Sequence, residues 1–294
     1  MNKAASLLVI ISLALFSVSC TKSAENIFQE NNNLGITEEA EANDYSINKD
    51  GSTIKNRYPA PKGYLRVDTP ENSFAEFLRN QKLKPYGDKA LFHNGKKKND
   101  SGIYDSVFDV DIGDRDLHQC ADAVMLLRAE YLYTNELYDQ ISFNFVSGFK
   151  AEYIKWMEGY RINVDGNNVN YFKNAAPSTS YESFRKYMDM VMAYASTLSL
   201  EKELTSVEDV ADIEIGDVFI VGGSPGHAVI VVDMAANKDS DKIFLLAQSY
   251  MPAQQTQILI SPLDEEISPW YSLKNKDRLI TPEWNFDLDT LKRF

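Results

Sequence analysis

Three residues have side chains that together can form a thiol-based catalytic site: Cys120, His227 and Gln248. Cys120 lies near the start of a predicted helix, where unpaired N–H groups and the helix dipole favour a thiolate over a thiol. His227 follows the glycine-rich stretch GGSPG and begins the apolar stretch HAVIVVD. Because an imidazole can remove the proton from a thiol, the pair predicts a cysteine nucleophile with a histidine base.

Gln248 enters this group through the pairing of two predicted strands. A turn near Asn237 and an opposite-charge pair between Asp233 and Lys242 set an antiparallel register in which His227 lies directly across from Gln248. A β-bulge would shift this pairing by one position. Without a bulge, the amide can fix the tautomer and the orientation of the imidazole.

Each of these residues also has a purely structural interpretation. A buried cysteine on a helix is a common small core residue, and a histidine at a strand start can bond to a backbone carbonyl. A helix-start Cys, a strand-start His and a cross-strand Gln in combination favour a nucleophile site. The other two histidines fit less well, because His118 is rotated about 200° from Cys120 on a helix and His93 lies in a predicted turn.

Other motifs carry less chemistry. The acidic stretch DVDIGDRD (109–116) lacks the spacing of a calcium loop, so we expect helix capping and a solvated turn, with no metal site and no cofactor. The net charge of −13 argues against nucleic-acid binding, and the lysines at 96–98 are predicted to lie in a solvated turn. The candidate substrate-cleft residues are Gln119, Asp122, Ser224, Tyr250 and Trp270.

The elements that position these residues indicate an α+β domain. Helices are predicted over 69–80, 114–134 and 180–200, with a capping box from Asp116 to Gln119 and mostly helical structure through 136–200. Four short strands follow, in the stretches DVFIV, HAVIVVD, KIFLLAQ and TQILIS. Helices followed by a strand meander are typical of the α+β class.

The N-terminal segment predicts export and anchoring to the bacterial membrane. Residues 1–19 have the charge and apolar run of a signal peptide, and the sequence SVSC suggests that Cys20 receives a lipid, with secretion without a lipid as the alternative. Residues 20–56 are predicted to be a flexible acidic tether, and 57–294 a single domain. An exported, membrane-anchored lipoprotein of the cell envelope, facing the periplasm or the cell surface, is therefore expected, with Cys120 as its lone remaining thiol.

Two resemblances follow from these stretches. From APKGYLRV through DLHQCADAVMLLRAEYLY and GDVFIVGGSPGHAVIVVD to SPWYS, roughly residues 57–290, the chain resembles the domain of unknown function 4846, common in Bacteroides-type envelope lipoproteins. The stretch GDVFIVGGSPGHAVIVVD is also similar to the papain-like NlpC and CHAP cell-wall peptidases and amidases. That likeness implies a helix-start Cys packed on a four- to six-stranded antiparallel meander, with a helical insertion at about 136–210. It also implies Cys120 as nucleophile, His227 as base and Gln248 as orienting residue.

The expected function is that of a lipid-anchored envelope thiol hydrolase that cleaves an amide, within peptidoglycan stem peptides or another peptide. The alternative is a catalytically inactive papain-like binding or scaffolding lipoprotein. An acyl or amide transferase using the same thiol is a third candidate.

Overall fold

The computed structural model describes residues 45–99 and 101–294, which belong to one compact unit, Asn43–Phe294. The predicted signal peptide, the predicted lipidation site Cys20 and the first part of the predicted tether lie outside the described residues. Among the described residues, no helix is both long enough and apolar enough to cross a membrane.

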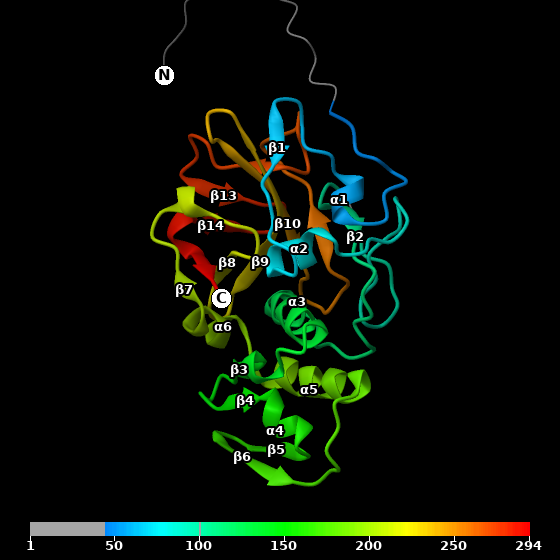
Figure 1. Cartoon of the computed structure of the whole chain (residues 1–294), viewed down its shortest axis with the longest axis vertical. Helices are drawn as coiled ribbons and strands as arrows, with labels where there is room; N and C mark the ends of the chain where they lie inside the picture. The colour runs from blue at the N-terminus through cyan, green and yellow to red at the C-terminus, as the bar shows by residue number, and fades with distance from the viewer. Residues whose placement is uncertain (1–44, 100) are drawn as a thin grey trace, which may run out of the picture. The chain divides into compact units, whose positions relative to one another are not determined.

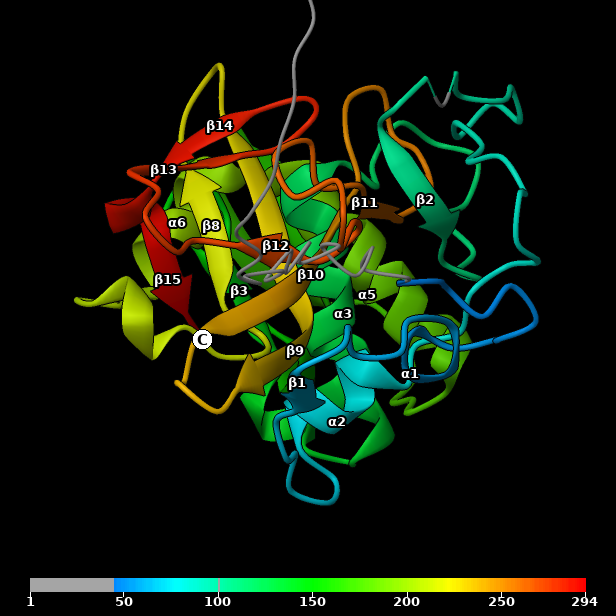
Figure 2. The ribbon, with the colours of Figure 1, turned by 90° about the horizontal axis from the view of Figure 1, so that it is seen from above.

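The apolar stretch after His227 forms the longest strand of an antiparallel sheet. Strand β9 (His227–Asn237) pairs with β8 (Val218–Val221) on one side and with β10 (Lys242–Gln248) on the other, as Figure 1 and Figure 2 show. The order of the sheet is β2-β11-β10-β9-β8-β15-β7, with β1 added to the end of β9 and β12 to β10. The remaining strands of this sheet are β1 (Tyr64–Arg66), β2 (Tyr104–Val107), β7 (Thr205–Ser206), β11 (Gln257–Leu259), β12 (Tyr271–Ser272) and β15 (Leu291–Arg293).

The four predicted strands are confirmed as β8 to β11, but the sheet has nine strands rather than four to six. The five additional strands are only two to four residues long. Segments this short contain too little alternation to be recognised as strands from their sequence.

Both faces of the central strands are buried, which explains why their sequences are apolar without interruption. On one face, Ala228, Ile230 and Val232 join the larger hydrophobic core that contains α3 (Cys120–Thr134). On the other face, Val229 and Val231 join a second core. Phe286 of the hairpin formed by β13 (Arg278–Ile280) and β14 (Asn285–Asp287) belongs to this second core. The sheet is therefore a middle layer, with α3 packed against β9 and β10 on one side.

The predicted helices are present with different ends. The helix predicted over 114–134 begins only at Cys120, and its capping box runs from Gln119 to Asp122 rather than from Asp116 to Gln119. The helix predicted over 180–200 is divided at residues 195–196 into α5 (Tyr181–Tyr194) and α6 (Thr197–Glu203), because Ser196 caps a new helix. The helix predicted over 69–80 is the shorter α2 (Phe74–Arg79), capped by Ser73.

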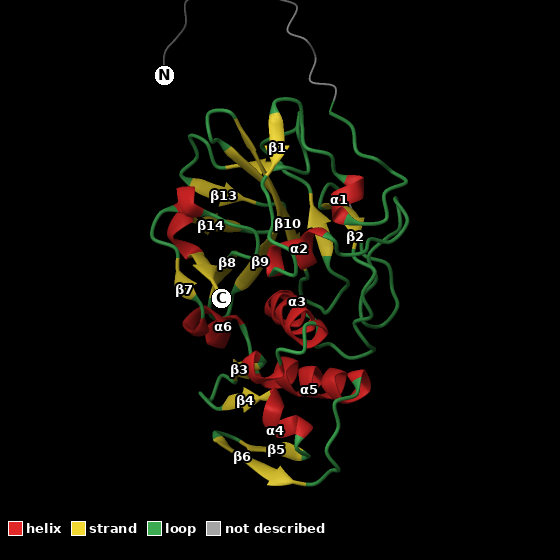
Figure 3. Cartoon of the chain, in the orientation of Figure 1, coloured by secondary structure: helices red, strands yellow, loops and turns green. Residues whose placement is uncertain are grey.

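The segment predicted as a helical insertion also contains two β-hairpins, so that prediction is wrong in part (Figure 3). One hairpin joins β3 (Ser142–Asn144) to β4 (Lys150–Glu152), and the other joins β5 (Tyr160–Asp165) to β6 (Asn168–Lys173). Between them lies α4 (Tyr153–Met157). The described residues also form three short 3-10 helices, η1 (Tyr138–Gln140), η2 (Val210–Asp212) and η3 (Leu288–Thr290).

The folded domain begins before the predicted boundary at residue 57. Helix α1 (Ile54–Arg57) has Ile54 fully buried, and the hydroxyl of Tyr45 accepts a hydrogen bond from the indole of Trp270 at 3.0 Å. Residues 45–56 therefore belong to the domain and not to the tether, because apolar side chains within a polar stretch find partners far away in the sequence.

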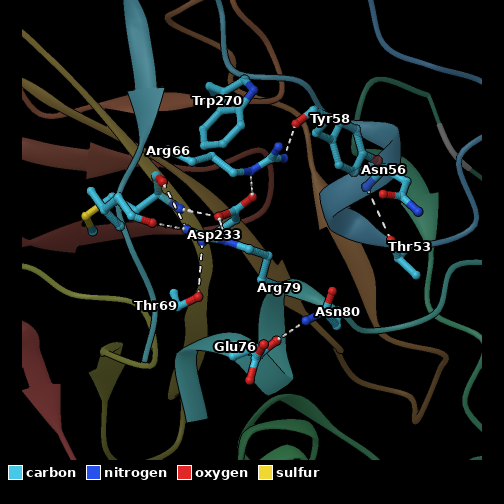
Figure 4. Close-up of polar contacts among 12 residues, drawn as sticks. Thr53, Asn56, Tyr58, Arg66, Thr69, Glu76, Arg79, Asn80, Asp233 and Trp270 are labelled. Atoms are coloured by element: carbon cyan, nitrogen blue, oxygen red, sulfur yellow. Dashed lines mark hydrogen bonds and ion pairs between the residues drawn. The ribbon is translucent and has the colours of Figure 1, made fainter. Parts of the chain in front are cut away.

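A buried carboxylate fastens the N-terminal elements to the central strand (Figure 4). Asp233 of β9 is fully buried and accepts hydrogen bonds from Arg66 at 2.8 Å and from Arg79 at 2.6 Å. The predicted pair between Asp233 and Lys242 is wrong, since the Lys242 ammonium bonds to the carbonyl oxygens of Ala211 and Ile213. The two arginines compensate a carboxylate whose burial alone would be very unfavourable.

Candidate active site

Cys120 is the first residue of α3 and lies in the wall of a pocket of about 310 Å³. The turn before β9 forms another part of the wall, through Gly223, Ser224, Pro225 and Gly226. The pocket lies where the end of α5 and the start of α6 also meet, and its remaining lining residues are Asp116, Leu117, Gln119, Ala121, Asp122, Met192, Ala193, Ala195, Ser196, Thr197 and Met251. The predicted nucleophile, Cys120, therefore lines a pocket that is bounded by the glycine-rich turn.

His227 and Gln248 meet, although the predicted register between their strands is wrong. Nε2 of His227 lies 2.8 Å from Oε1 of Gln248. Ala247 pairs with Ile230, after a register shift between Leu245 and Leu246. One position further along, Gln248 stands across from residue 229, so it reaches His227 diagonally on the same face of the sheet. Long side chains span such diagonal positions.

A chain of polar groups continues beyond Gln248. Its side-chain N–H donates to the Glu283 carboxylate at 2.6 Å, and Glu283 forms a 2.7 Å ion pair with Lys98. Lys98 is buried, with 7 % of its surface exposed, so the prediction of a solvated turn is wrong for this lysine. The turn does hold exposed residues, but its last lysine folds inward to reach Glu283 and the amide oxygen of Gln257.

This chain determines which ring nitrogen of His227 carries the proton. A carboxylate only accepts hydrogen bonds, so the Gln248 amide must direct its N–H toward Glu283 and its oxygen toward His227. That oxygen also only accepts, and therefore Nε2 of His227 is the protonated nitrogen. Nδ1 is left as the acceptor, the form that a general base requires.

Aromatic residues enclose the imidazole of His227. Its ring centre lies 4.8 Å from that of Tyr250, 5.5 Å from Trp284 and 5.9 Å from Phe286. Burial in this environment lowers the pKa of His227 to about 4, against the opposing effect of the bond to Gln248. The ring is consequently neutral at pH 7.

The Cys120 thiol is also neutral in this state. Burial is the largest cause that raises its pKa to about 11, and the nearby Asp122 adds to the shift. The backbone N–H groups of Ala121, Ala228 and Cys120 stabilise the thiolate form and oppose the shift. The prediction that the helix start makes Cys120 a thiolate is therefore wrong for this state, because desolvation outweighs the helix N–H groups.

The interaction with Ala228 places the sulfur near the residue that follows His227 in β9. The structure contains no hydrogen bond between the thiol and the His227 ring. The arrangement is thus a neutral thiol next to a strand that carries a neutral, oriented imidazole. Such a pair can work by general-base catalysis once a substrate brings the reacting groups together.

Asp122 forms a buried acidic group in the same pocket. Its Oδ2 accepts the backbone N–H of Gln119 at 3.0 Å, whereas its Oδ1 is buried without a hydrogen-bond partner. Burial raises the pKa of Asp122 to about 8, so this carboxyl is protonated at pH 7. A protonated carboxyl can donate as well as accept a hydrogen bond at the pocket wall.

Of the predicted cleft residues, Gln119, Asp122 and Ser224 line the pocket with Cys120, and Tyr250 packs on His227. Trp270 is not brought to the pocket: it is fully buried, bonds to Tyr45 and lies near Arg66. Lys98 and Glu283 were not predicted, because both occur in irregular segments whose sequence contains no periodic signal. No cluster of His, Cys, Asp and Glu suited to a metal ion occurs within the described part of the chain.

Comparison with known proteins identifies the family but not an activity. Residues 54–293 match the family described as domain of unknown function (4846). The chain belongs to this family. The family match spans every element from α1 to β15, and therefore Cys120, His227 and Gln248 together with residues 54–56, which the sequence assigned to the tether. No curated protein and no solved structure matches the chain.

Proposed function

We propose that the protein is a thiol hydrolase of the bacterial cell envelope, anchored by a lipid on Cys20, that cleaves an amide bond in peptidoglycan stem peptides. The observation that carries the proposal is the hydrogen bond of 2.8 Å between His227 and Gln248, on a strand whose next residue, Ala228, has a backbone N–H that stabilises the Cys120 thiolate. A base with a defined tautomer, on a strand that passes the helix-start thiol, supplies the two groups that nucleophilic catalysis requires.

The reaction begins with the transfer of the thiol proton from Cys120 to Nδ1 of His227. The sulfur then forms a bond to the amide carbonyl carbon, and the carbonyl oxygen takes up negative charge. Backbone N–H groups at the start of α3 stabilise this charge, because they already stabilise the thiolate form of Cys120. When the C–N bond breaks, His227 gives its proton to the leaving amine and an acyl thioester remains on Cys120.

Water completes the reaction. Neutral His227 removes a proton from a water molecule, which attacks the thioester carbonyl and releases the carboxylic acid and the thiol. The pocket of about 310 Å³ is near the lower end of the usual range for small-molecule sites, which suits one or two residues of a peptide. Its protonated Asp122 offers a hydrogen-bond donor to a substrate carbonyl.

The test is hydrolysis of purified peptidoglycan fragments by the full chain, with products identified by mass spectrometry. We expect new amino and carboxyl ends within the stem peptide and no such products with Cys120→Ser. Cys120→Ser keeps the size of the side chain, so a loss of products reports the thiol and not a collapse of the pocket. Unchanged products from the variant would exclude Cys120 as the nucleophile.

A second candidate is a binding or scaffolding lipoprotein that retains the pocket without catalysis. The raised pKa of Cys120 and the lack of a hydrogen bond to His227 favour it. In that case Cys120→Ala would bind the same peptidoglycan fragments with unchanged affinity, and the unmodified protein would leave them intact. Binding by calorimetry together with product analysis separates the two candidates.

A further inference from the structure

The two reacting groups of the proposed active site are covered in this structure. Cys120 is 6 % exposed and His227 is 1 % exposed, although a pocket of about 310 Å³ lies beside the thiol. A substrate amide must reach both the sulfur and the imidazole for catalysis. The side chains that cover these two groups must therefore move before the proposed reaction starts.

Tyr250 and Met251 lie beside both groups. The centre of the Tyr250 ring is 4.8 Å from that of His227, and Tyr250 is itself partly exposed. Met251 lines the pocket that contains Cys120 and is 54 % exposed. Burial is the largest cause that raises the pKa of Tyr250, and the charges of Glu283 and Cys120 add to the shift. The phenol is therefore close to the thiol as well as to the imidazole.

The chain is held firmly on each side of residues 250–251. Ser249 is fully buried, and its hydroxyl donates at 2.7 Å to the carbonyl oxygen of His118, in the segment that leads into α3. On the other side, the backbone N–H of Ala253 donates at 2.6 Å to the carboxylate of Asp116. Both bonds join this turn to the segment that precedes the thiol.

Between these two positions, packing and not hydrogen bonding holds the chain. Within the described residues, the Tyr250 hydroxyl and the backbone N–H groups of Tyr250 and Met251 donate to no partner. A short segment with fixed ends and few bonds between them opens at a low cost in free energy, because few contacts are broken. Loops that close over active sites typically have this character.

We propose that Tyr250 and Met251 form a gate over the Cys120 pocket. In the closed state, the Tyr250 ring covers His227 and the Met251 side chain narrows the access to the thiol. In the open state, residues 250–252 move outward between their anchored neighbours, and the substrate peptide occupies the space that the two side chains leave. The role of the gate in hydrolysis rests on the proposed function, whereas its control of access to the thiol does not.

Alkylation of Cys120 measures access to the thiol without any substrate. The full chain reacts at pH 9 with iodoacetamide and with 5-iodoacetamidofluorescein, and labelling of the peptide that contains Cys120 is followed by mass spectrometry. Both reagents carry the same reactive group, so a change in the pKa of the thiol changes both rates by the same factor. An obstruction slows the bulky reagent more, and the ratio of the two rates therefore reports the gate.

Variants of the two gate residues test the proposal. We expect Tyr250→Ala to raise the rate with the bulky reagent about tenfold and the rate with iodoacetamide no more than about threefold. Met251 is exposed, so Met251→Ala keeps the core intact, and it should raise the ratio of bulky to small reagent about twofold. Urea denaturation shows whether each variant is folded, and Met251→Ala decides alone if Tyr250→Ala is not. An unchanged ratio, or equal increases with both reagents, would overturn the gate.

Trp284→Ala is the matched control. Trp284 is a second partly exposed ring on His227, with a distance of 5.5 Å between ring centres, but it does not line the Cys120 pocket. Its backbone N–H donates to the Thr281 hydroxyl, which donates in turn to its carbonyl oxygen. Removal of this ring should leave the ratio of the two rates unchanged. An equal rise in Trp284→Ala would show that any loosening around the imidazole exposes the thiol, which would contradict a gate formed by Tyr250 and Met251.

The outcome is independent of the test for hydrolysis. If the gate variants alkylate as the unmodified chain does, the gate is wrong and Cys120 can still be the nucleophile. If the protein leaves every peptidoglycan fragment intact, the proposed hydrolase is wrong and the change in the ratio of rates still identifies the gate.

Discussion

The side-chain amide of Gln248 donates to the Glu283 carboxylate over 2.6 Å, and this bond fixes the direction in which the amide oxygen points. The oxygen faces Nε2 of His227, which must then carry the proton. Glu283, which bonds to Gln248 and not to the imidazole, therefore sets the tautomer of His227. The Cys–His–Gln group predicted from the sequence extends to Glu283 and, through an ion pair, to Lys98.

Replacement of Glu283 tests this relationship. In Glu283→Gln the neighbouring amide no longer faces an obligatory acceptor and can rotate, so His227 loses its fixed tautomer. Loss of a charge-assisted hydrogen bond is worth about 1.5–3 kcal/mol, which predicts an activity roughly ten- to a hundredfold lower. Nitrogen NMR of His227 should show Nε2–H in the unmodified protein and a mixture of tautomers in the variant.

The matched control is Asp287→Asn, which removes a carboxylate from the same hairpin. Asp287 forms an exposed ion pair with Arg278. Exposed pairs contribute little, so this variant should keep both its activity and its His227 tautomer. A single Nε2–H tautomer in Glu283→Gln would show that another group orients the ring.

The thiol of Cys120 should react slowly at neutral pH in the free protein. Because burial raises its pKa to about 11, the fraction of thiolate and hence the alkylation rate should rise about tenfold per pH unit from pH 7 to near 11. Iodoacetamide labelling read by peptide mass spectrometry separates Cys120 from Cys20. His227→Ala should leave the rate at pH 7 unchanged, whereas a plateau below pH 8 that requires His227 would indicate a preformed ion pair.

Asp122 should make the domain less stable as the pH rises. Its pKa is about 8 in the folded protein, above the usual value for an unfolded chain, so the folded state binds more protons between those two values. The contribution is fully present below about pH 4 and is lost as the pH rises through about 8. Asp122→Asn keeps an acceptor for the N–H of Gln119 and cannot ionise.

The free energies of unfolding of the two proteins test whether ionisation of Asp122 lowers stability. Between pH 5 and pH 9 the unmodified chain should lose free energy of unfolding that Asp122→Asn does not lose. The difference in free energy of unfolding, variant minus unmodified chain, should therefore rise by an amount on the order of a few kcal/mol. Urea denaturation at both pH values provides the measurement. An equal difference at pH 5 and pH 9 would mean that the carboxyl is already ionised at pH 5.

The ion pairs of Asp233 should contribute far more to stability than those at the surface. Removal of the Arg79 charge by Arg79→Met leaves a fully buried carboxylate with one arginine partner in place of two. Breaking a buried pair from one side typically lowers the free energy of unfolding by about 3–5 kcal/mol. Arg278→Met, which breaks the exposed pair with Asp287, is expected to cost less than about 1 kcal/mol in the same denaturation experiment.

The sequence predicted the contact between His227 and Gln248 even though the register was wrong. Near His227 the predicted pairing differs from the observed one by two positions, because β9 runs on to Asn237, which moves the pairing by three positions, and the register shift after Leu245 reverses one of them. A shift of two positions leaves every side chain on its own face of the sheet, whereas a shift of one reverses all of them. The two long side chains therefore still meet.

Other features could not be predicted because they depend on contacts between distant segments. Lys98 is buried in an ion pair with Glu283, and neither segment contains a pattern that indicates the other. The hairpin of β5 and β6 did have a signal, since its strands alternate around the turn sequence DGNN. The pKa of Cys120 was predicted in the wrong direction, because a helix start is visible in a sequence and the depth of burial is not.

The most direct test of the proposed function is to look for the acyl thioester on Cys120. The full chain is mixed with purified stem-peptide fragments, quenched in acid, digested and analysed by mass spectrometry. The proposed mechanism predicts that the peptide containing Cys120 gains the mass of an acyl group, that hydroxylamine removes it, and that His227→Ala fails to form it. Fragments that bind and remain intact, with Cys120 unmodified at every time point, would contradict the hydrolase and favour the binding protein.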